Sequence, residues 1–329
     1  MGMNQEQMEF QLAALCQALE KQSIQRIYLT GCGGGIANLR PCEYVLKKYL
    51  EPGTVISDYA AEMMAGGGRG MDSHAVVIVG SFNGTMLEAV EAMRWAKSRG
   101  AFVIGVTYTP NTPIASEATF PFLCSNLEAE EYALSPMSAG VLLAFALVKA
   151  LTGVNRLSMA WDNLLRLKEI NQKAYEAIVK PRGEEFVQRF QKAPMIYTVG
   201  SGLNYYNAYI FATCYLLEMQ WMNASPINAA EMFHGFLEMV DKDSNIFMLI
   251  NRGEFRSIDE RACAFLSRFT RGAFVLDAKE YAMDGIDPEL ETVVGMLVTA
   301  YVTRCFAHIL ADARHHPLTT RRYYLKFDY

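Results

Sequence analysis

The stretch Arg26-Ile-Tyr-Leu-Thr-Gly31-Cys-Gly-Gly-Gly35 decides the fold class of this chain. Its first residues have the composition of a short strand, and the glycines that follow predict a tight turn. The run from Ile36 to Tyr49 then predicts a helix. Strand, glycine turn and helix in this order open a parallel α/β unit, and the amides at such a helix start can bind an anion, commonly phosphate. Asn38 stands where a dinucleotide fingerprint would need its third glycine, which disfavours that reading.

A second unit of the same kind follows. Ala75-Val-Val-Ile-Val-Gly80 is apolar throughout, as expected of a central parallel strand, and a polar loop leads from it into a helix at 86–97. Ala101-Phe-Val-Ile-Gly-Val106 predicts the next strand. The two loops predict an anion-binding site whose candidate residues are Gly33, Gly34, Gly35, Ser81, Asn83 and Thr85.

The second half of the chain repeats the plan of the first. Ile196-Tyr-Thr-Val-Gly-Ser-Gly202 parallels Ile27-Tyr-Leu-Thr-Gly-Cys-Gly33, and strands are also expected at 245–250 and 272–276. The intervening residues 135–192 predict helices, with breaks at Gly153 and at 181–183. We therefore expect an α/β protein with an N-terminal domain at 1–155, linking helices at 156–192 and a C-terminal domain with a tail at 193–329.

Composition narrows the class of protein. Of the 329 residues 51% are hydrophobic, which is typical of a globular chain with a large core. The net charge of −5 and the lack of a polybasic block argue against nucleic acid as a partner. The seven cysteines are scattered, which predicts reduced thiols and a cytoplasmic protein. The apolar run at 137–148 is too short to span a bilayer, so no membrane contact is expected.

The stretch from Glu218 to His234 holds the candidate catalytic groups. Glu218 ends an apolar, helix-like run, and Glu231 precedes His234 by one helical-turn spacing. A carboxylate base and an imidazole are the groups needed to move protons on a sugar. We expect a helix, a short link and a second helix start between Glu218 and His234.

These motifs resemble the SIS (sugar isomerase) family, and within it the deglycases of fructosamine 6-phosphates. The resemblance covers nearly the whole chain and implies two tandem SIS domains, each a parallel five-stranded sheet flanked by helices in an αβα sandwich. Its most specific parts are four segments: 218–221, 230–235, 259–262 and the tail at 316–323.

The resemblance also implies roles for residues. Glu218 and His234 match the sixteen-residue spacing of the family's base and acid, and Glu231 matches a carboxylate that orients the histidine or the substrate. Arg321 is a candidate substrate-binding residue, because the C-terminal tail often closes over the site in this fold. The family needs no metal and no cofactor, acts on a phosphorylated sugar–amine compound and commonly dimerises. The helices at 135–152 and 290–313 are candidate homodimer interfaces.

The sequence departs from the family in its phosphate loops. Gly35 replaces a serine of the first loop, and Met86 replaces a threonine of the second. Two alternatives to a deglycase therefore stay open. The first is a sugar-phosphate aldose–ketose isomerase that uses the same base, and the second is a non-catalytic sugar-phosphate-binding protein.

Overall fold

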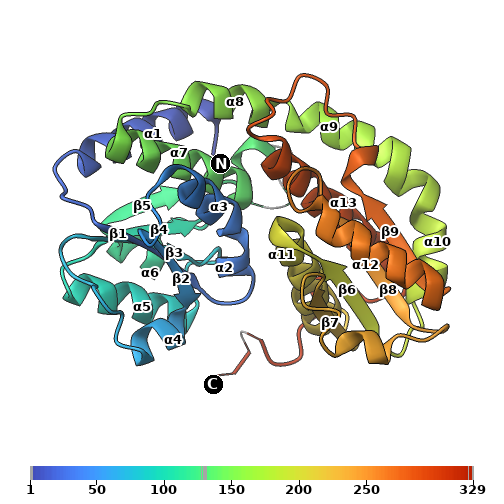
Figure 1. The fold of residues 1–329 in the computed structure, drawn as a ribbon. Helices are drawn as coiled ribbons and strands as arrows, with labels where there is room; N and C mark the ends of the chain where they lie inside the picture. Colours follow the sequence, from blue (N-terminus) through green and yellow to red (C-terminus); the bar gives the residue numbers. More distant parts are fainter. Residues whose placement is uncertain (1–2, 127, 129–131, 325, 328–329) are drawn as a thin grey trace. The chain divides into compact units, whose positions relative to one another are not determined.

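The computed structural model describes residues 3–126, 128, 132–324 and 326–327. The chain divides into two compact units, Met1–Lys168 and Glu169–Tyr329, and the division falls inside the helical stretch 156–192. Both units have an all-parallel sheet with helices on its two faces, as the sequence predicts (Figure 1).

The first unit has five strands in the order β2-β1-β3-β4-β5. They are β1 (Arg26–Gly31), β2 (Val55–Tyr59), β3 (Ala75–Gly80), β4 (Phe102–Thr107) and β5 (Phe120–Leu123). The helices are α1 (Gln5–Leu19), α2 (Gly34–Asn38), α3 (Arg40–Tyr49), α4 (Ala60–Ala65), α5 (Leu87–Ser98), α6 (Pro113–Glu117), α7 (Pro136–Thr152) and α8 (Leu157–Leu165). The single helix expected at 36–49 is two helices, because Pro41 is disfavoured inside a helix and lies instead in the first turn of α3.

The core of the first unit is built from small and branched side chains. Val77, Val79 and Val103 pack against Ala89 and Met93 of α5. Helices α4 and α5 lie on one face of the sheet, and α1, α3 and α7 lie on the other (Figure 1). Burial on both faces accounts for the uninterrupted apolar composition of β3.

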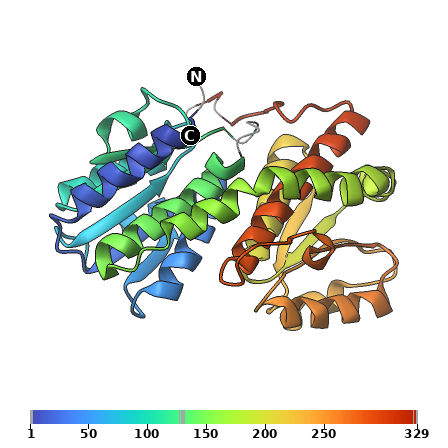
Figure 2. The ribbon, with the colours of Figure 1, turned by 90° about the horizontal axis from the view of Figure 1, so that it is seen from above.

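The second unit has strands in the order β7-β6-β8-β9. They are β6 (Ile196–Gly200), β7 (Ala224–Asn228), β8 (Asn245–Ile250) and β9 (Ala273–Asp277). The helical segments are α9 (Leu167–Ala174), the π-helix η2 (Tyr175–Val179), α10 (Lys180–Phe190), α11 (Gly202–Ile210), the π-helix η3 (Phe211–Met219), α12 (Arg256–Phe269) and α13 (Glu291–Ala313). In Figure 2, α12 lies on one side of the strands and α13 on the other.

The second sheet therefore has four strands in the described residues, and the expectation of five is wrong for this unit. The residues after β9 form a short 3₁₀ turn at Ala278–Glu280 and then a stretch rich in Asp, Gly and Pro, which disfavours a strand. The outer edge of β9 is partly capped instead, because the Arg182 guanidinium donates a hydrogen bond to the Val275 carbonyl (2.8 Å).

An aromatic cluster holds the second unit together. The Phe186 ring stacks on Phe306 of α13 at 4.6 Å and meets Phe211, Phe247 and Phe274 edge-on at 5.2–6.0 Å. Helix α13 is long and apolar enough to cross a membrane, but 67% of its apolar window is buried inside the structure, as in the core helix of a globular unit. The predicted break at 181–183 does not occur, since α10 runs through it directly after the wider π-helical turn η2.

Candidate active site

Glu218 is positioned by the π-helix η3. The backbone N–H of Gln220 bonds the carbonyl of Tyr215, five residues earlier, where an α-helix would bond four residues back. Phe211 and Leu216 bury the inner face of η3 and leave Glu218 half-buried near its end. π-Helical segments are rare, and those inside helices occur frequently at functional sites.

The chain after η3 is strained and is held by the C-terminal tail. Trp221 has a φ of 54°, an unusual conformation for a bulky residue. Its ring contacts His316 edge-on at 4.8 Å, and the Gln220 amide donates a hydrogen bond to the His316 carbonyl (2.5 Å). Arg314 donates to the side-chain oxygen of Gln220 (3.2 Å) and to the Gln191 carbonyl (2.6 Å). Residues 314–316 at the start of the tail therefore pack against the chain that follows Glu218.

A pocket of about 500 Å³ opens where η3 and the tail meet, and we call it the Glu218 pocket. Its lining residues are Leu217, Glu218, Trp221, Met222, Asn223, Arg321, Arg322, Tyr323 and Tyr324. Glu218 Oε1 accepts an ion-paired hydrogen bond from Arg321 Nε at 2.9 Å. Burial raises the pKa of the Glu218 carboxyl, and the Arg321 guanidinium opposes part of that rise. A carboxylate with a raised pKa can take and hold a proton nearer neutral pH.

His234 and Glu231 lie in a different place. They follow β7 in a series of turns that begins where Asn228 Oδ1 accepts the Ala230 N–H at 3.0 Å. The His234 N–H donates to the Glu231 carbonyl (3.0 Å), and the side chains of both residues are exposed. Buried Met232 anchors the turns on the sheet. The second helix start expected here is absent, because the loop closes as turns and then as the 3₁₀ helix Phe236–Met239.

The strand β7 separates the two candidate catalytic groups. Residues 222–223 lie at the amino edge of the sheet, where the Ile196 N–H donates to the Asn223 carbonyl (3.0 Å). The turns with His234 lie beyond the opposite, carboxyl edge, and the five residues of β7 alone span about 16 Å at the usual rise of a strand. His234 does not line the Glu218 pocket. Within one chain the described residues therefore do not bring Glu218 and His234 together.

The predicted anion loops lie side by side in the first unit. β1 and β3 are adjacent, with Gly31 opposite Gly80, and the chain leaves them in opposite directions across the sheet. The carboxyl edge at such a topological switch point is where open α/β sheets bind ligands. The loop after β1 carries Gly33, whose φ of 49° favours glycine, and a Cβ added there would meet nothing within 4 Å.

Gly35 has a packing role in this crevice. A Cβ on Gly35 would lie 2.4 Å from the Gly80 carbonyl oxygen, so α2 can approach β3 only with glycine here. The Gly35 N–H already donates to the Cys32 carbonyl (2.8 Å). The amides of Gly33 and Gly34 are therefore better placed than that of Gly35 to meet a ligand.

The loop after β3 has one buried and two exposed polar side chains among the predicted anion-binding residues. Ser81 is buried, and its N–H donates to the Val106 carbonyl (3.1 Å). Asn83 and Thr85 are exposed, and Asn83 Oδ1 accepts a hydrogen bond from the Tyr108 hydroxyl (2.7 Å). This leaves Thr85 as an exposed hydroxyl at the start of α5.

The matching crevice of the second unit is filled by the protein itself. The ring of Phe255 covers Gly202, where an added Cβ would lie 2.3 Å from it. Beneath it, Asn251 donates both its backbone N–H (2.8 Å) and its side-chain amide (2.6 Å) to Asp259, which is fully buried. Burial raises the pKa of the Asp259 carboxyl, but this carboxyl serves an internal network rather than an opening.

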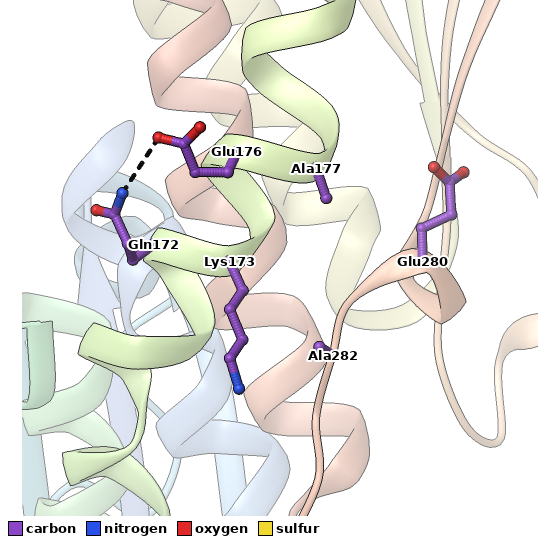
Figure 3. Close-up of a pocket in the computed structure, with 6 residues that line it drawn as sticks. All are labelled: Gln172, Lys173, Glu176, Ala177, Glu280 and Ala282. Carbon is purple, nitrogen blue, oxygen red and sulfur yellow. Dashed lines mark hydrogen bonds between the residues drawn. The ribbon is translucent and has the colours of Figure 1, made fainter.

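A further groove of about 460 Å³ lies on the second unit, between the helical stretch α9–η2 and the loop after β9. It is lined by Gln172, Lys173, Glu176, Ala177, Glu280 and Ala282 (Figure 3). Lys173 pairs with Glu169 (2.6 Å), and Glu176 pairs with Lys180 (2.8 Å). These are salt bridges one helical turn apart on an exposed face, and the groove contains none of the predicted site residues.

The sequence includes Trp221 in the characteristic segment 218–221 but does not predict it as a pocket residue. Its side chain is 43% exposed. The signal that places it in the pocket is the positive φ together with the stacking of the tail, and neither is visible in the composition of the chain.

Comparison with known proteins gives relatives over the full length of the chain. It is 31% identical to fructosamine deglycase FrlB of Bacillus subtilis over 97% of both chains. It is 23% identical to the fructoselysine 6-phosphate deglycase of Escherichia coli K12, over 94% of this chain and 88% of the relative. No protein-family model matches the sequence.

Solved structures agree with this result. A Bacillus subtilis protein described as a phosphosugar isomerase superposes with a TM-score of 0.93 at 29% identity, covering 97% of both chains. A similarly described protein from Salmonella typhimurium gives a TM-score of 0.91 at 26% identity, covering 100% of this chain and 98% of the other. The C-terminal domain of glucosamine-fructose-6-phosphate aminotransferase from Francisella tularensis shares the fold at 14% identity, with a TM-score of 0.70.

Proposed function

The chain belongs to the fructosamine deglycase family of enzymes with the SIS fold, and from this premise we propose that it hydrolyses a 6-phosphorylated Amadori compound. The products are an aldose 6-phosphate and a free amino acid. The proposal rests on the observation that Glu218 is a half-buried carboxylate with a raised pKa in a pocket of about 500 Å³. The resemblance described above assigns the role of base to this residue.

The reaction needs only proton transfers and water. After the sugar ring opens, a base removes a proton from C1 of the ketosamine and gives an enaminol. A proton returned to C2 leaves an imine between C1 and the nitrogen. Water adds to C1, the C–N bond breaks, and the amine leaves with the proton that balances its charge. Glu218 is assigned to the C1 proton, because its raised pKa suits a general base near neutral pH.

His234 is assigned to ring opening and to later proton transfer, and Glu231 to the orientation of His234 or of the substrate. Because β7 keeps His234 away from Glu218 in one chain, the proposal includes a homodimer in which His234 of the partner subunit completes the site. The exposure of His234 supports this, since an exposed side chain on a turn can reach a neighbouring chain.

The loops of the first unit are assigned to the phosphate group. The amides of Gly33 and Gly34, with Ser81, Asn83 and Thr85, flank the switch point between β1 and β3. Gly35 supports them by letting α2 pack against β3. Arg321 is assigned to the substrate side of the Glu218 pocket.

The compartment proposed for this enzyme is the cytoplasm. All seven cysteines are thiols rather than disulfides, and three of them are buried. A chain with this many unoxidised cysteines suits a reducing compartment.

In the deciding experiment the purified protein is incubated with a panel of phosphorylated and unphosphorylated Amadori compounds, and the released amine and aldose are measured. We expect both products in equal amounts from the phosphorylated members. Conversion of fructose 6-phosphate to an aldose without any amine release would identify an isomerase. Binding of sugar phosphate with no turnover of any member would identify a sugar-phosphate-binding protein.

A further inference from the structure

Arg322 is an exposed guanidinium on the wall of the Glu218 pocket. It lies over the indole ring of Trp221, with its central carbon 4.3 Å from the ring centroid. Among the residues that the structure describes, no carboxylate or carbonyl pairs with it. Stacking occupies the flat face of a guanidinium and leaves the N–H groups at its edge directed outward, where they can bind a carboxylate through two parallel hydrogen bonds.

The neighbouring Arg321 is engaged differently. Its Nε pairs with Glu218 (2.9 Å), and its Nη1 donates to the carbonyls of Leu318 (2.7 Å) and Thr320 (2.9 Å). Arg321 thus holds the tail and the base, while Arg322 keeps its N–H edge for a ligand. The pocket contains one carboxylate against two guanidinium groups, and its other lining residues carry no formal charge. An excess of positive charge in a partly enclosed pocket favours an anionic ligand.

We propose that Arg322, held flat by Trp221, binds the α-carboxylate of the amino-acid part of the substrate and so discriminates between substrates with and without that carboxylate. The inference rests on the proposed deglycase function and adds the part of the substrate that the Glu218 pocket selects. It makes Arg322 a specificity-determining residue.

The geometry of the substrate fits a shared pocket. In an α-linked compound the carboxylate carbon is two bonds from the amine nitrogen, and that nitrogen is bonded to C1, where the base acts. The carboxylate must therefore be bound close to the base. Trp221 follows Glu218 by three residues, and both line the same pocket. The strained backbone of Trp221 directs its exposed ring under Arg322, and strain of this kind persists where the surroundings enforce it.

The test compares two substrates that differ in one group. One is the 6-phosphorylated fructosamine of an α-amino acid with a free carboxylate, and the other is its carboxamide. We expect the wild-type enzyme to prefer the acid in kcat/KM by about 10- to 100-fold, the range for hydrogen bonds to a charged group. Arg322→Gln is expected to remove that preference by lowering kcat/KM for the acid while leaving the amide unchanged.

A matched control uses an equivalent pair outside the pocket. Arg99 lies over the ring of Trp95 at the same 4.3 Å, in the first unit, and Arg99→Gln should change neither substrate. Trp221→Leu is the second pocket variant, and it should lower the preference because Arg322 loses its support. Circular dichroism checks that each variant is folded.

The outcomes test the role of Arg322 and the deglycase function separately. Equal turnover of acid and amide by the wild-type enzyme, or an equal loss on both substrates in Arg322→Gln, overturns the role of Arg322 and leaves the deglycase function standing. Hydrolysis of neither compound by the wild-type enzyme rejects the deglycase function, and the role of Arg322 with it.

Discussion

The carboxyl edges of the two sheets have the same strand order around the switch point but different contents. In the first unit a Cβ added at Gly33 would meet nothing within 4 Å, and the adjoining loop exposes Asn83 and Thr85. In the second unit the ring of Phe255 covers Gly202, and Asp259 is sealed beneath it. The first edge leaves open space beside Gly33, whereas the second edge is filled by its own side chains.

The second unit places its candidate base at the opposite edge. Glu218 lies at the end of η3, near the amino edge of the sheet, in the pocket formed with the tail. The rule that open α/β sheets bind ligands at the carboxyl ends of their strands therefore agrees with the position of the candidate phosphate loops but not with that of the candidate base. The proposed function thus assigns different tasks to opposite edges of the two sheets.

The largest expected effect distinguishes two carboxylates of the second unit, the half-buried Glu218 and the fully buried Asp259. Both Glu218 and Asp259 have pKa values raised by burial. Glu218→Gln should lower kcat by about 10³-fold, because general-base catalysis contributes roughly 10²–10⁴-fold, and it should leave the fold intact. The measurement is steady-state turnover of the phosphorylated Amadori substrate.

Asp259→Asn is the matched control. It should leave kcat near the wild-type value and lower the free energy of unfolding by about 1–3 kcal/mol, since Asn251 loses an acceptor in a buried network. Near-normal turnover in Glu218→Gln would remove the base from the mechanism and with it the functional difference between the two edges.

The second effect concerns the two ends of β7. Glu218→Gln and His234→Gln should each be nearly inactive alone. When both variants are coexpressed, half of the dimers are mixed, and each mixed dimer has one intact site of two, so activity should return to about a quarter of wild type. Mixed dimers isolated with two different affinity tags give the cleanest measurement. If the mixed dimers are as inactive as the parents, both residues act within one chain.

The third effect tests why the first unit keeps glycine at Gly35. Gly35→Ser restores the hydroxyl usual in the family but forces a Cβ to within 2.4 Å of the Gly80 oxygen. It should lower the free energy of unfolding by about 2 kcal/mol, within the range for overpacking, and should not strengthen phosphate binding. Urea denaturation and phosphate titration measure the two quantities. A variant of wild-type stability would show that α2 can move away from β3.

The sequence predicts the central strands of the two units better than the edge strand β7. The central strands of both units were predictable from apolar runs next to glycine, as at Ala75–Gly80. Strand β7 was missed because Ala224-Ser-Pro-Ile-Asn228 contains Pro226 and small polar residues, which an edge strand tolerates. With β7 unseen, Glu218 and His234 looked like neighbours across a short link.

The Glu218 pocket was only partly predictable for a related reason. Glu218 and Arg321 were identified by resemblance, but their ion pair depends on how the tail docks about 100 positions later in the chain. The π-helical turns of η3 and the positive φ of Trp221 arise from tertiary packing, which overrides local helical preference. Neither the π-helical turns nor the positive φ can therefore be predicted from the local sequence.

The smallest expected effect separates the two arginines of the pocket through pH. The pKa of Glu218 is raised by burial and lowered by Arg321, which is the charged group paired with it among the residues that the structure describes. Since the base must be ionised, kcat/KM falls as the pH drops through that pKa. Arg321→Met removes the opposing charge, so the pKa of Glu218 should rise further and the acidic limb of the pH profile of kcat/KM should move to higher pH.

Arg322→Gln is the control. It should lower kcat/KM for a carboxylate substrate without moving the acidic limb. An acidic limb at the wild-type pH in Arg321→Met would show that Arg321 does not pair with Glu218 in solution. The candidate base would then lack the charged partner that distinguishes its surroundings from those of Asp259.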